Sequence, residues 1–136
     1  MELKAARDFI RSHHHAVLAT LREDGSPQLS PVTAGVDDAG RVTISTRETA
    51  FKVKHIRRSG RAWIAILPDT FFGEWIYVEG NATSESLPSA MRGLVAYYRS
   101  ISGEHPDWDD YRAAMERDQR CLIHLDLTRA GPDRHG

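Results

Sequence analysis

Short apolar segments separated by tight turns near the start of the chain limit its fold more than any other feature. Residues 15–21 are mostly apolar, and 23–26 follow with an Asp-Gly pair, which tolerates the positive φ angles of a hairpin turn. A second segment, 27–36, ends at another turn-forming stretch, 37–40, and a third, 41–46, alternates apolar and polar residues. Two turns between three strands predict an antiparallel meander.

Apolar residues at helical spacing predict four helices around these strands. The first begins at Leu3, and the second ends at Gly60, since glycine commonly follows the last residue of a helix. The predicted helices are 3–12, 49–59, 87–101 and 105–117. Three further predicted strands are 61–67, 74–84 and 120–127.

Six strands joined by short turns, with few parallel crossovers, predict a mainly β fold with edge helices. The expected architecture is a six-stranded antiparallel barrel. We assign residues 1–128 to this domain. Residues 129–136 are polar and contain glycine and proline, so we expect a flexible C-terminal tail.

Size and composition indicate one soluble domain. The 136 residues are 40% hydrophobic and 27% charged, which allows a hydrophobic core of ordinary size. Cys121 is the single cysteine, so no internal disulfide is possible, and its apolar neighbours predict a buried small side chain rather than a nucleophile. No apolar run reaches the roughly 20 residues that cross a bilayer, and the charged N-terminus is unlike a signal peptide. We therefore expect a cytoplasmic protein with no membrane partner.

Positive charge is concentrated in residues 47–61. This segment has six basic residues and one acidic residue, in a chain of net formal charge −1. It opens a helix just after Ser45 and Thr46, and lysines beside the free N–H groups of a helix start suit a phosphate. A solvated helix face is the commoner reason for a basic helix, and both interpretations stay open at this point. Nucleic acid is not expected, because the segment is short and lacks interleaved aromatic residues.

Other polar clusters offer little chemistry of their own. His13, His14 and His15 are consecutive, and side chains of a strand alternate between faces, so they cannot all bind one metal, and we expect none. Asp107 precedes a predicted helix and is expected to cap it. The sequence has no convincing nucleophile–base set and no glycine-rich dinucleotide motif, so we assign no catalytic side chain. An enzyme of this kind needs a cofactor for its chemistry.

Four segments, in their order and spacing, resemble the pyridoxamine 5'-phosphate oxidase-like family of FMN- and F420-binding split barrels. Residues 16–32 resemble the first hairpin of that family, and residues 51–62 resemble its phosphate-binding helix and the next strand. Residues 75–80 resemble the following Val-Glu-Gly strand. Residues 97–111 resemble the actinobacterial branch that uses the deazaflavin coenzyme F420.

The resemblance implies a split β-barrel that forms a homodimer, with cofactor sites at the subunit interface. The implied activity is an F420-dependent oxidoreductase that transfers hydride from the reduced deazaflavin to a small conjugated acceptor. The residues implied to lie against the ring system are Gln28, Leu29, Ser30, Pro31 and Val32. Those implied to bind the phosphate are Ser45, Arg47, Lys52 and Lys54, with Trp75 and Tyr77 approaching from the partner chain or its edge.

Two alternatives fit the same residues. FMN also carries a phosphate on a ribityl arm, so an FMN-dependent oxidoreductase of this fold is one of them. A non-catalytic protein that binds a cofactor or tetrapyrrole is the other. Coenzyme F420 adds an anionic tail, which Arg57 and Arg58 suit. His55 and Tyr77 are conceivable proton donors, and the apolar residues near Phe71 favour a flat substrate.

Overall fold

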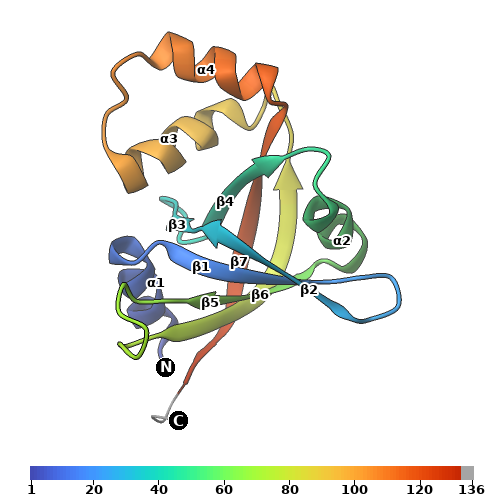
Figure 1. The fold of residues 1–136 in the computed structure, drawn as a ribbon, viewed down its shortest axis with the longest axis vertical. Helices are drawn as coiled ribbons and strands as arrows, with labels where there is room; N and C mark the ends of the chain where they lie inside the picture. Colours follow the sequence, from blue (N-terminus) through green and yellow to red (C-terminus); the bar gives the residue numbers. More distant parts are fainter. Residues whose placement is uncertain (133–136) are drawn as a thin grey trace.

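A computed structural model describes residues 1–132 and confirms a mainly β protein with helices at the edges of the sheet. All pairings between neighbouring strands are antiparallel, and the described strands form one sheet in the order β2-β1-β5-β6-β7-β4-β3. The sheet curls into a half-open barrel (Figure 1). The helices are α1 (Leu3–Ser12), α2 (Phe51–Ser59), α3 (Met91–Ser102) and α4 (Trp108–Arg117). The strands are β1 (His15–Leu21), β2 (Pro27–Thr33), β3 (Gly35–Val36), β4 (Val42–Arg47), β5 (Arg61–Ile66), β6 (Ile76–Glu85) and β7 (Arg120–Gly131).

The sheet has seven strands, so the prediction of six is wrong. The difference arises at Ala34, which divides the predicted strand 27–36 into β2 and β3. Ala34 is fully buried, its N–H donates to the carbonyl of His14 over 2.8 Å, and its carbonyl bonds to Nδ1 of the same histidine. The chain therefore leaves β1 at this residue, and β3 pairs with β4 on the other side of the barrel.

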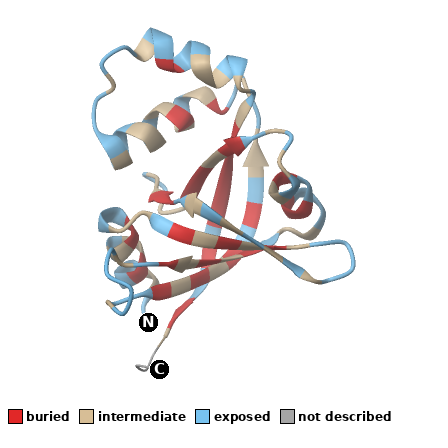
Figure 2. Ribbon diagram, viewed as in Figure 1, coloured by how far each residue is buried: buried red, intermediate tan, exposed pale blue. Residues whose placement is uncertain are grey.

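The core lies between the curled halves of the sheet, where the inward residues of the strands meet (Figure 2). β1 alternates strictly, with Ala16, Leu18 and Thr20 buried and the residues between them partly exposed. α1 closes one end of the barrel with the fully buried Ala6 and Ile10. Because each strand buries one face, its sequence alternates apolar and polar residues, and this pattern located the strands correctly.

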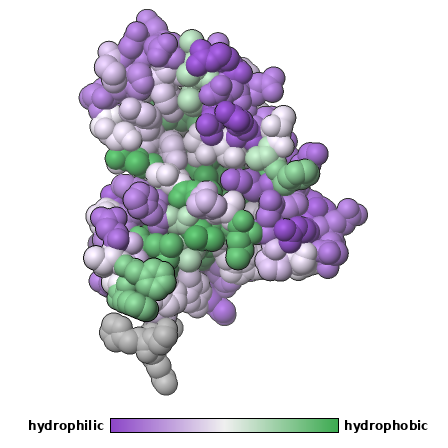
Figure 3. All heavy atoms as spheres, in the orientation of Figure 1, coloured by the Kyte–Doolittle hydropathy of each residue, from purple (hydrophilic) through white to green (hydrophobic). Residues whose placement is uncertain are grey.

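The outer face of strands β6, β5, β1 and β2 is unusually apolar. The registers place Tyr77, Ala65, Val17 and Pro31 in one row across these four strands. These side chains are partly or fully exposed, and none of the helices within residues 1–132 covers the middle of the row. Figure 3 shows apolar residues gathered on this side of the molecule. An antiparallel sheet that met only water would carry polar residues there.

Helix α2 and the α3–α4 hairpin each follow a strand and pack against the sheet. α2 follows β4, and Gly60 ends it in the left-handed conformation with φ of 68°, as expected. α3 and α4 form a hairpin that packs on Leu122 of β7 through Leu94 and Tyr111. Asp107 caps α4 as predicted, since its carboxylate accepts the N–H of Asp110 over 3.1 Å.

The last strand is longer than predicted. β7 continues through Gly131, which pairs with Tyr77 of β6, so residues 129–131 are in the sheet and not in the tail. Residues 133–136, the end of the expected tail, lie outside the described residues. Cys121 is fully buried, as its neighbours indicated. Within residues 1–132, no helix is both long and apolar enough to cross a membrane.

Candidate functional site

A cavity of about 570 Å³ lies where the ends of β2 and β4 meet α2 and the α3–α4 hairpin. We call it the tyrosine cavity, because each helix of the hairpin contributes tyrosine to its wall. Its lining residues are Pro31, Val32, Thr33, Ser45, Thr46, Lys52, Tyr97, Tyr98, Tyr111, Met115 and Arg120. The cavity therefore combines aromatic walls, a group of hydroxyls and two cationic side chains.

The two cations are the most informative part of this cavity. Lys52 lies in the first turn of α2, and Arg120 opens β7. Within the described part of the chain, neither makes a hydrogen bond or an ion pair, and the Nε atom of Arg120 is buried without an acceptor. Burial, and to a smaller extent the charge of Arg120, hold the pKa of Lys52 below its usual value. Two partly desolvated cations without a carboxylate partner are suited to bind an anion.

Hydroxyl groups surround the cations. Ser45 and Thr46 lie near the end of β4 on one side, and Thr33 ends β2 on the other. Tyr97 donates its hydroxyl to the carbonyl of Thr33 over 2.8 Å. This bond ties α3 to β2 and so fixes one wall of the cavity.

Tyr97 and Tyr111 keep their protons at neutral pH. Burial raises the pKa of Tyr97, and it raises the pKa of Tyr111 to about 12. Tyr111 donates its hydroxyl to the carbonyl of Leu94 over 2.7 Å, and its ring centroid lies 5.1 Å from that of Tyr98. These rings pack against each other as an aromatic cluster, so they form a rigid wall beside the cations.

The structure brings four of the predicted site residues together. Pro31, Val32, Ser45 and Lys52 all line the tyrosine cavity. The sequence reasoning missed Arg120, whose only signal was a charged residue at the start of a predicted strand. It also missed the wall residues Thr33, Tyr97, Tyr98, Tyr111 and Met115, whereas the hydroxyl of Thr46 had been noted beside that of Ser45. The three tyrosines lie in the segment 97–111, which resembles the F420-dependent branch.

The other seven predicted site residues do not line this cavity. Gln28, Leu29 and Ser30 precede it on β2, and Leu29 is 66% exposed. Arg47 is exposed at the end of β4, and the Lys54 Nζ lies 5.5 Å from the ring centroid of Phe51 on the surface of α2. Trp75 directly precedes β6 and Tyr77 lies at its start, and β5 and β1 separate β6 from β2.

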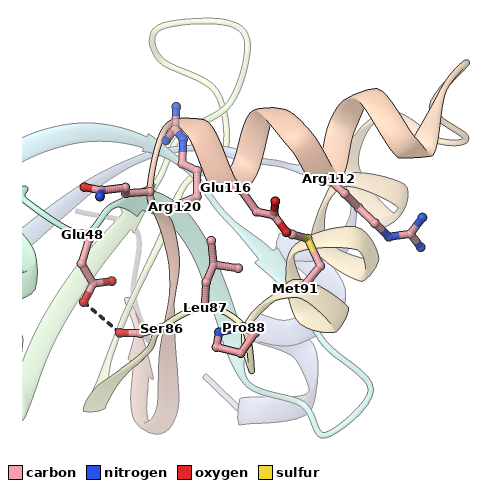
Figure 4. A pocket seen from close by; sticks show the side chains of 9 residues that line it. Glu48, Ser86, Leu87, Pro88, Met91, Arg112, Glu116 and Arg120 are labelled. Carbon is pink, nitrogen blue, oxygen red and sulfur yellow. Dashed lines mark hydrogen bonds between the residues drawn. The ribbon is translucent and has the colours of Figure 1, made fainter.

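A second cavity of about 620 Å³ shares Arg120 with the first (Figure 4). Leu87, Pro88 and Met91 form its apolar part. Its carboxylate Glu48 already has partners, since it accepts hydrogen bonds from Ser86 and Arg57. Arg120 is thus bordered by two cavities, and it has no ion pair in either among the described residues.

Two reactive side chains considered from the sequence, Cys121 and His55, are not placed to react with a ligand in the tyrosine cavity. Burial and the nearby Glu48 raise the pKa of the Cys121 thiol to about 12, so the nucleophilic thiolate does not form at neutral pH. His55 is buried, and its Nδ1 is bonded to the hydroxyl of Thr20 over 3.0 Å. Neither side chain lines the tyrosine cavity. The side chains that line the cavity therefore suit the binding of a charged, aromatic group better than redox chemistry of their own.

Comparison with solved structures shows how widely this fold occurs. The conserved hypothetical protein Rv2991 from Mycobacterium tuberculosis is similar with a TM-score of 0.77 and 23% identity, over 96% of this chain and 82% of that one. An F420 reductase has a TM-score of 0.69 and 16% identity, over 92% of this chain and 94% of that one. HutZ, the haem storage protein from Vibrio cholerae, has a TM-score of 0.71 and 13% identity, over 96% and 94%. At these identities the likeness is one of fold.

The family is shown by the sequence itself. The profile of the pyridoxamine 5'-phosphate oxidase family matches residues 3–131, which include every strand described above and the whole tyrosine cavity. The resemblance inferred from the four segments is thereby confirmed. This chain belongs to the pyridoxamine 5'-phosphate oxidase family.

Proposed function

We propose that this protein is an oxidoreductase that binds coenzyme F420 in the tyrosine cavity and passes hydride to a small conjugated acceptor. The observation that carries the proposal is the pair of unpartnered cations, Lys52 and Arg120, at one cavity. A phosphate would supply both with the acceptor oxygens that the chain does not offer. When bound, the reduced deazaflavin supplies the hydride.

The side chains around the cations would bind and orient the cofactor. Lys52 and Arg120 would hold the phosphate, and Ser45 would donate its hydroxyl to the same group. Pro31 and Val32 at the end of β2 would lie against the ring system. Orientation of reactants and exclusion of water are then the contribution of the protein to the rate.

The choice of F420 over FMN rests on likeness and not on the phosphate site. The F420 reductase shares this fold over most of both chains, and residues 97–111 resemble the F420-dependent branch. The arginines considered for the anionic tail are already engaged. Arg57 is bonded to Glu48 and Ser84, and Arg58 is bonded to the carbonyl of Leu21. The tail would therefore need to lie elsewhere, or these contacts would open.

We propose that the working unit is a homodimer formed through the apolar outer face of β6, β5, β1 and β2. Pro31 belongs both to that face and to the tyrosine cavity, so a second copy on the face would also border the cofactor. Trp75 and Tyr77 do not reach the cavity of their own chain, which fits their supply by the second copy. Because F420 is a soluble intracellular cofactor, the proposal places the protein in the cytoplasm.

The cofactor proposal is tested by titrating the purified protein with F420, FMN and haem in parallel. We expect tight F420 binding that weakens in Lys52→Gln and remains in Lys54→Gln, the matched exposed lysine of the same helix. Preference for FMN would retain the site and make the protein a flavin oxidoreductase. Haem is included because HutZ, which shares the fold, is a haem storage protein. Binding of haem alone would favour a storage or transport function over catalysis.

The dimer is tested by light scattering on Ala65→Arg, which places a charge in the middle of the apolar row. We expect this variant to be monomeric and to bind the cofactor weakly. Ala5→Arg, on the exposed side of α1, is the matched control and should leave the dimer intact. A monomeric wild-type protein that binds cofactor normally would refute the dimer and leave the cofactor proposal standing.

A further inference from the structure

A third cavity, of about 380 Å³, lies along one side of α3 and beside α4. We call it the arginine cavity. Cations and apolar side chains line it, namely Arg92, Arg99, Arg112, Met91, Val95 and Ala96. No acidic residue is among these described lining residues, and none of them lines the tyrosine cavity. The cofactor proposal makes no use of this cavity.

The spacing of residues along α3 brings these side chains to one side of the helix. Arg92, Val95, Ala96 and Arg99 follow one another at intervals of one to four residues, and each lies within a turn of the next on the same face. Helix α4 packs beside α3 and supplies Arg112 from across the groove. The face therefore has a cation at each end and an apolar floor between them.

The guanidinium groups are accessible to a ligand. Arg92 is exposed, and the side chains of Arg99 and Arg112 are 52% and 48% accessible. Within the described part of the chain, the Arg92 side chain has neither a hydrogen bond nor an ion pair. Arg112 lies 3.8 Å from Oδ1 of Asp109, which is too far for a hydrogen bond. Two positive charges therefore face the cavity without a closely bound carboxylate.

Arg99 is held in position by two neighbours. Its Nε lies 2.6 Å from Oε1 of Glu104, and its guanidinium carbon lies 4.9 Å from the ring centroid of Trp108. A guanidinium has five N–H donors, so this ion pair leaves donors for a second acceptor. Because the side chain is already ordered, it loses less conformational entropy when it binds an anion.

The arginine cavity continues into the second cavity, since Met91 and Arg112 line both. Figure 4 shows Met91 between Arg112 and the apolar side chains of Leu87 and Pro88. The carboxylate of Glu116 lines the second cavity and would repel an anion there. An anionic group therefore fits the arginine end of the joined cavities, and an apolar group fits the end at Leu87.

We propose that the joined cavities bind an amphipathic acid, a carboxylate with an alkyl or aryl body. Its carboxylate lies among Arg92, Arg99 and Arg112, and its apolar body passes Met91 toward Leu87. Guanidinium groups form charge-assisted, often bidentate bonds with a carboxylate, and removal of the apolar body from water adds to the affinity. The site does not depend on the identity of the proposed cofactor.

The proposal is tested on the wild-type protein by ¹³C NMR of the methionine methyl groups during titration with octanoate. Met91 lies in the proposed site and Met115 in the tyrosine cavity, so their methyl groups distinguish the two places. Acetate has the head alone, and octylammonium has the same body with the opposite charge. We expect octanoate to shift Met91 to saturation and leave Met115 in place, with affinities about tenfold or more weaker for both comparison ligands.

Two exposed variants and one control locate the anionic head. Arg92→Gln should weaken octanoate binding about tenfold or more, since one charge-assisted contact is lost. Ala96→Glu should weaken it as well, because the new carboxylate lies one turn from both Arg92 and Arg99 and pairs with them. Arg117→Gln is the matched control, because this exposed arginine of α4 lines none of the three cavities.

The wild-type titration alone can overturn the proposal. No saturation with octanoate, a shift of Met115 in place of Met91, or octylammonium binding as tightly as octanoate would each do so. Each of these results is independent of the F420 titration, so failure here leaves the cofactor proposal standing. Loss of affinity in Arg117→Gln equal to that in Arg92→Gln would also overturn it, because net charge and not the site would then account for binding.

Discussion

Removal of the Lys52 charge should separate cofactor binding from folding. Lys52 has no partner within the described chain, and its lowered pKa shows that the surroundings disfavour its charge. Lys52→Gln removes one charge-assisted contact to a phosphate, worth about 1.5–3 kcal/mol, which corresponds to an affinity about 10- to 150-fold weaker. The same change relieves desolvation and repulsion from Arg120, so the cofactor-free protein should be equally stable or more stable by up to about 1 kcal/mol.

Two measurements on the same preparation check this prediction. Urea unfolding without cofactor gives the stability, and F420 fluorescence at fixed ionic strength gives the affinity. Lys54→Gln removes the same charge from the exposed side of α2, where the Lys54 ammonium lies near the ring of Phe51. It should change both quantities little. The control therefore measures any effect of the protein's net charge on its affinity for an anionic ligand.

Some results would refute the reasoning. If Lys52→Gln lowered the stability by more than about 1 kcal/mol and left the affinity unchanged, Lys52 would be a structural residue. The double variant Lys52→Gln/Arg120→Gln gives a further check. Because both cations would bind one anion, the double variant should lose less affinity than the sum of the two single variants. Strict additivity would mean that the two side chains act on separate groups.

Three further predictions concern the fold that holds the cavities. In Gly80→Ala, the new Cβ would lie 1.9 Å from the backbone oxygen of Asp126, so β6 and β7 must separate, and we expect a loss of about 3 kcal/mol or more in urea unfolding. Asp107→Ala removes the cap of α4 and should cost about 1 kcal/mol, with the cofactor-free circular dichroism spectrum retained. The pKa of Glu85 is lowered in the folded protein. Its contribution to the free energy of unfolding is therefore present above the ordinary glutamate pKa of 4.5, and it is lost as the pH falls through the lower folded value. Glu85→Gln should therefore be less stable than wild type at pH 7, through the weakened bond to His124, and the difference should shrink in acid.

The local features of the fold could be predicted because their causes are local. Residues 3–12 and 15–21 form α1 and β1 with the predicted bounds, since periodicity of apolar residues reports directly on a buried face. Asp107 caps a helix through an atom three residues away. The predicted starts of α3 and α4 were early, because residues 87–90 form turns and Asp107 fixes the first turn of α4.

The parts that could not be predicted depend on contacts between distant segments. Ala34 has the composition of an ordinary strand residue, and only its bonds to His14 show that the chain changes partner there. The last residues of β7 are polar and contain glycine, and their pairing with the start of β6 holds them in the sheet. Lys52 was found from the helix start beside it, whereas Arg120 meets Lys52 only through the closure of the barrel.

The unpaired state of Arg120 is a property of the arrangement and not of the composition. The chain has 19 acidic residues, and Glu48 and Glu116 line the cavity beside Arg120. Glu48 is nevertheless bonded to Arg57 and Ser86, so a potential partner is held away from the guanidinium by other contacts. A chain selected for stability alone would pair this arginine, because unpaired, partly buried charge is unfavourable. The anion proposed above would relieve the local charge conflict at Lys52 and Arg120, and the predicted gain of stability in Lys52→Gln would measure that conflict directly.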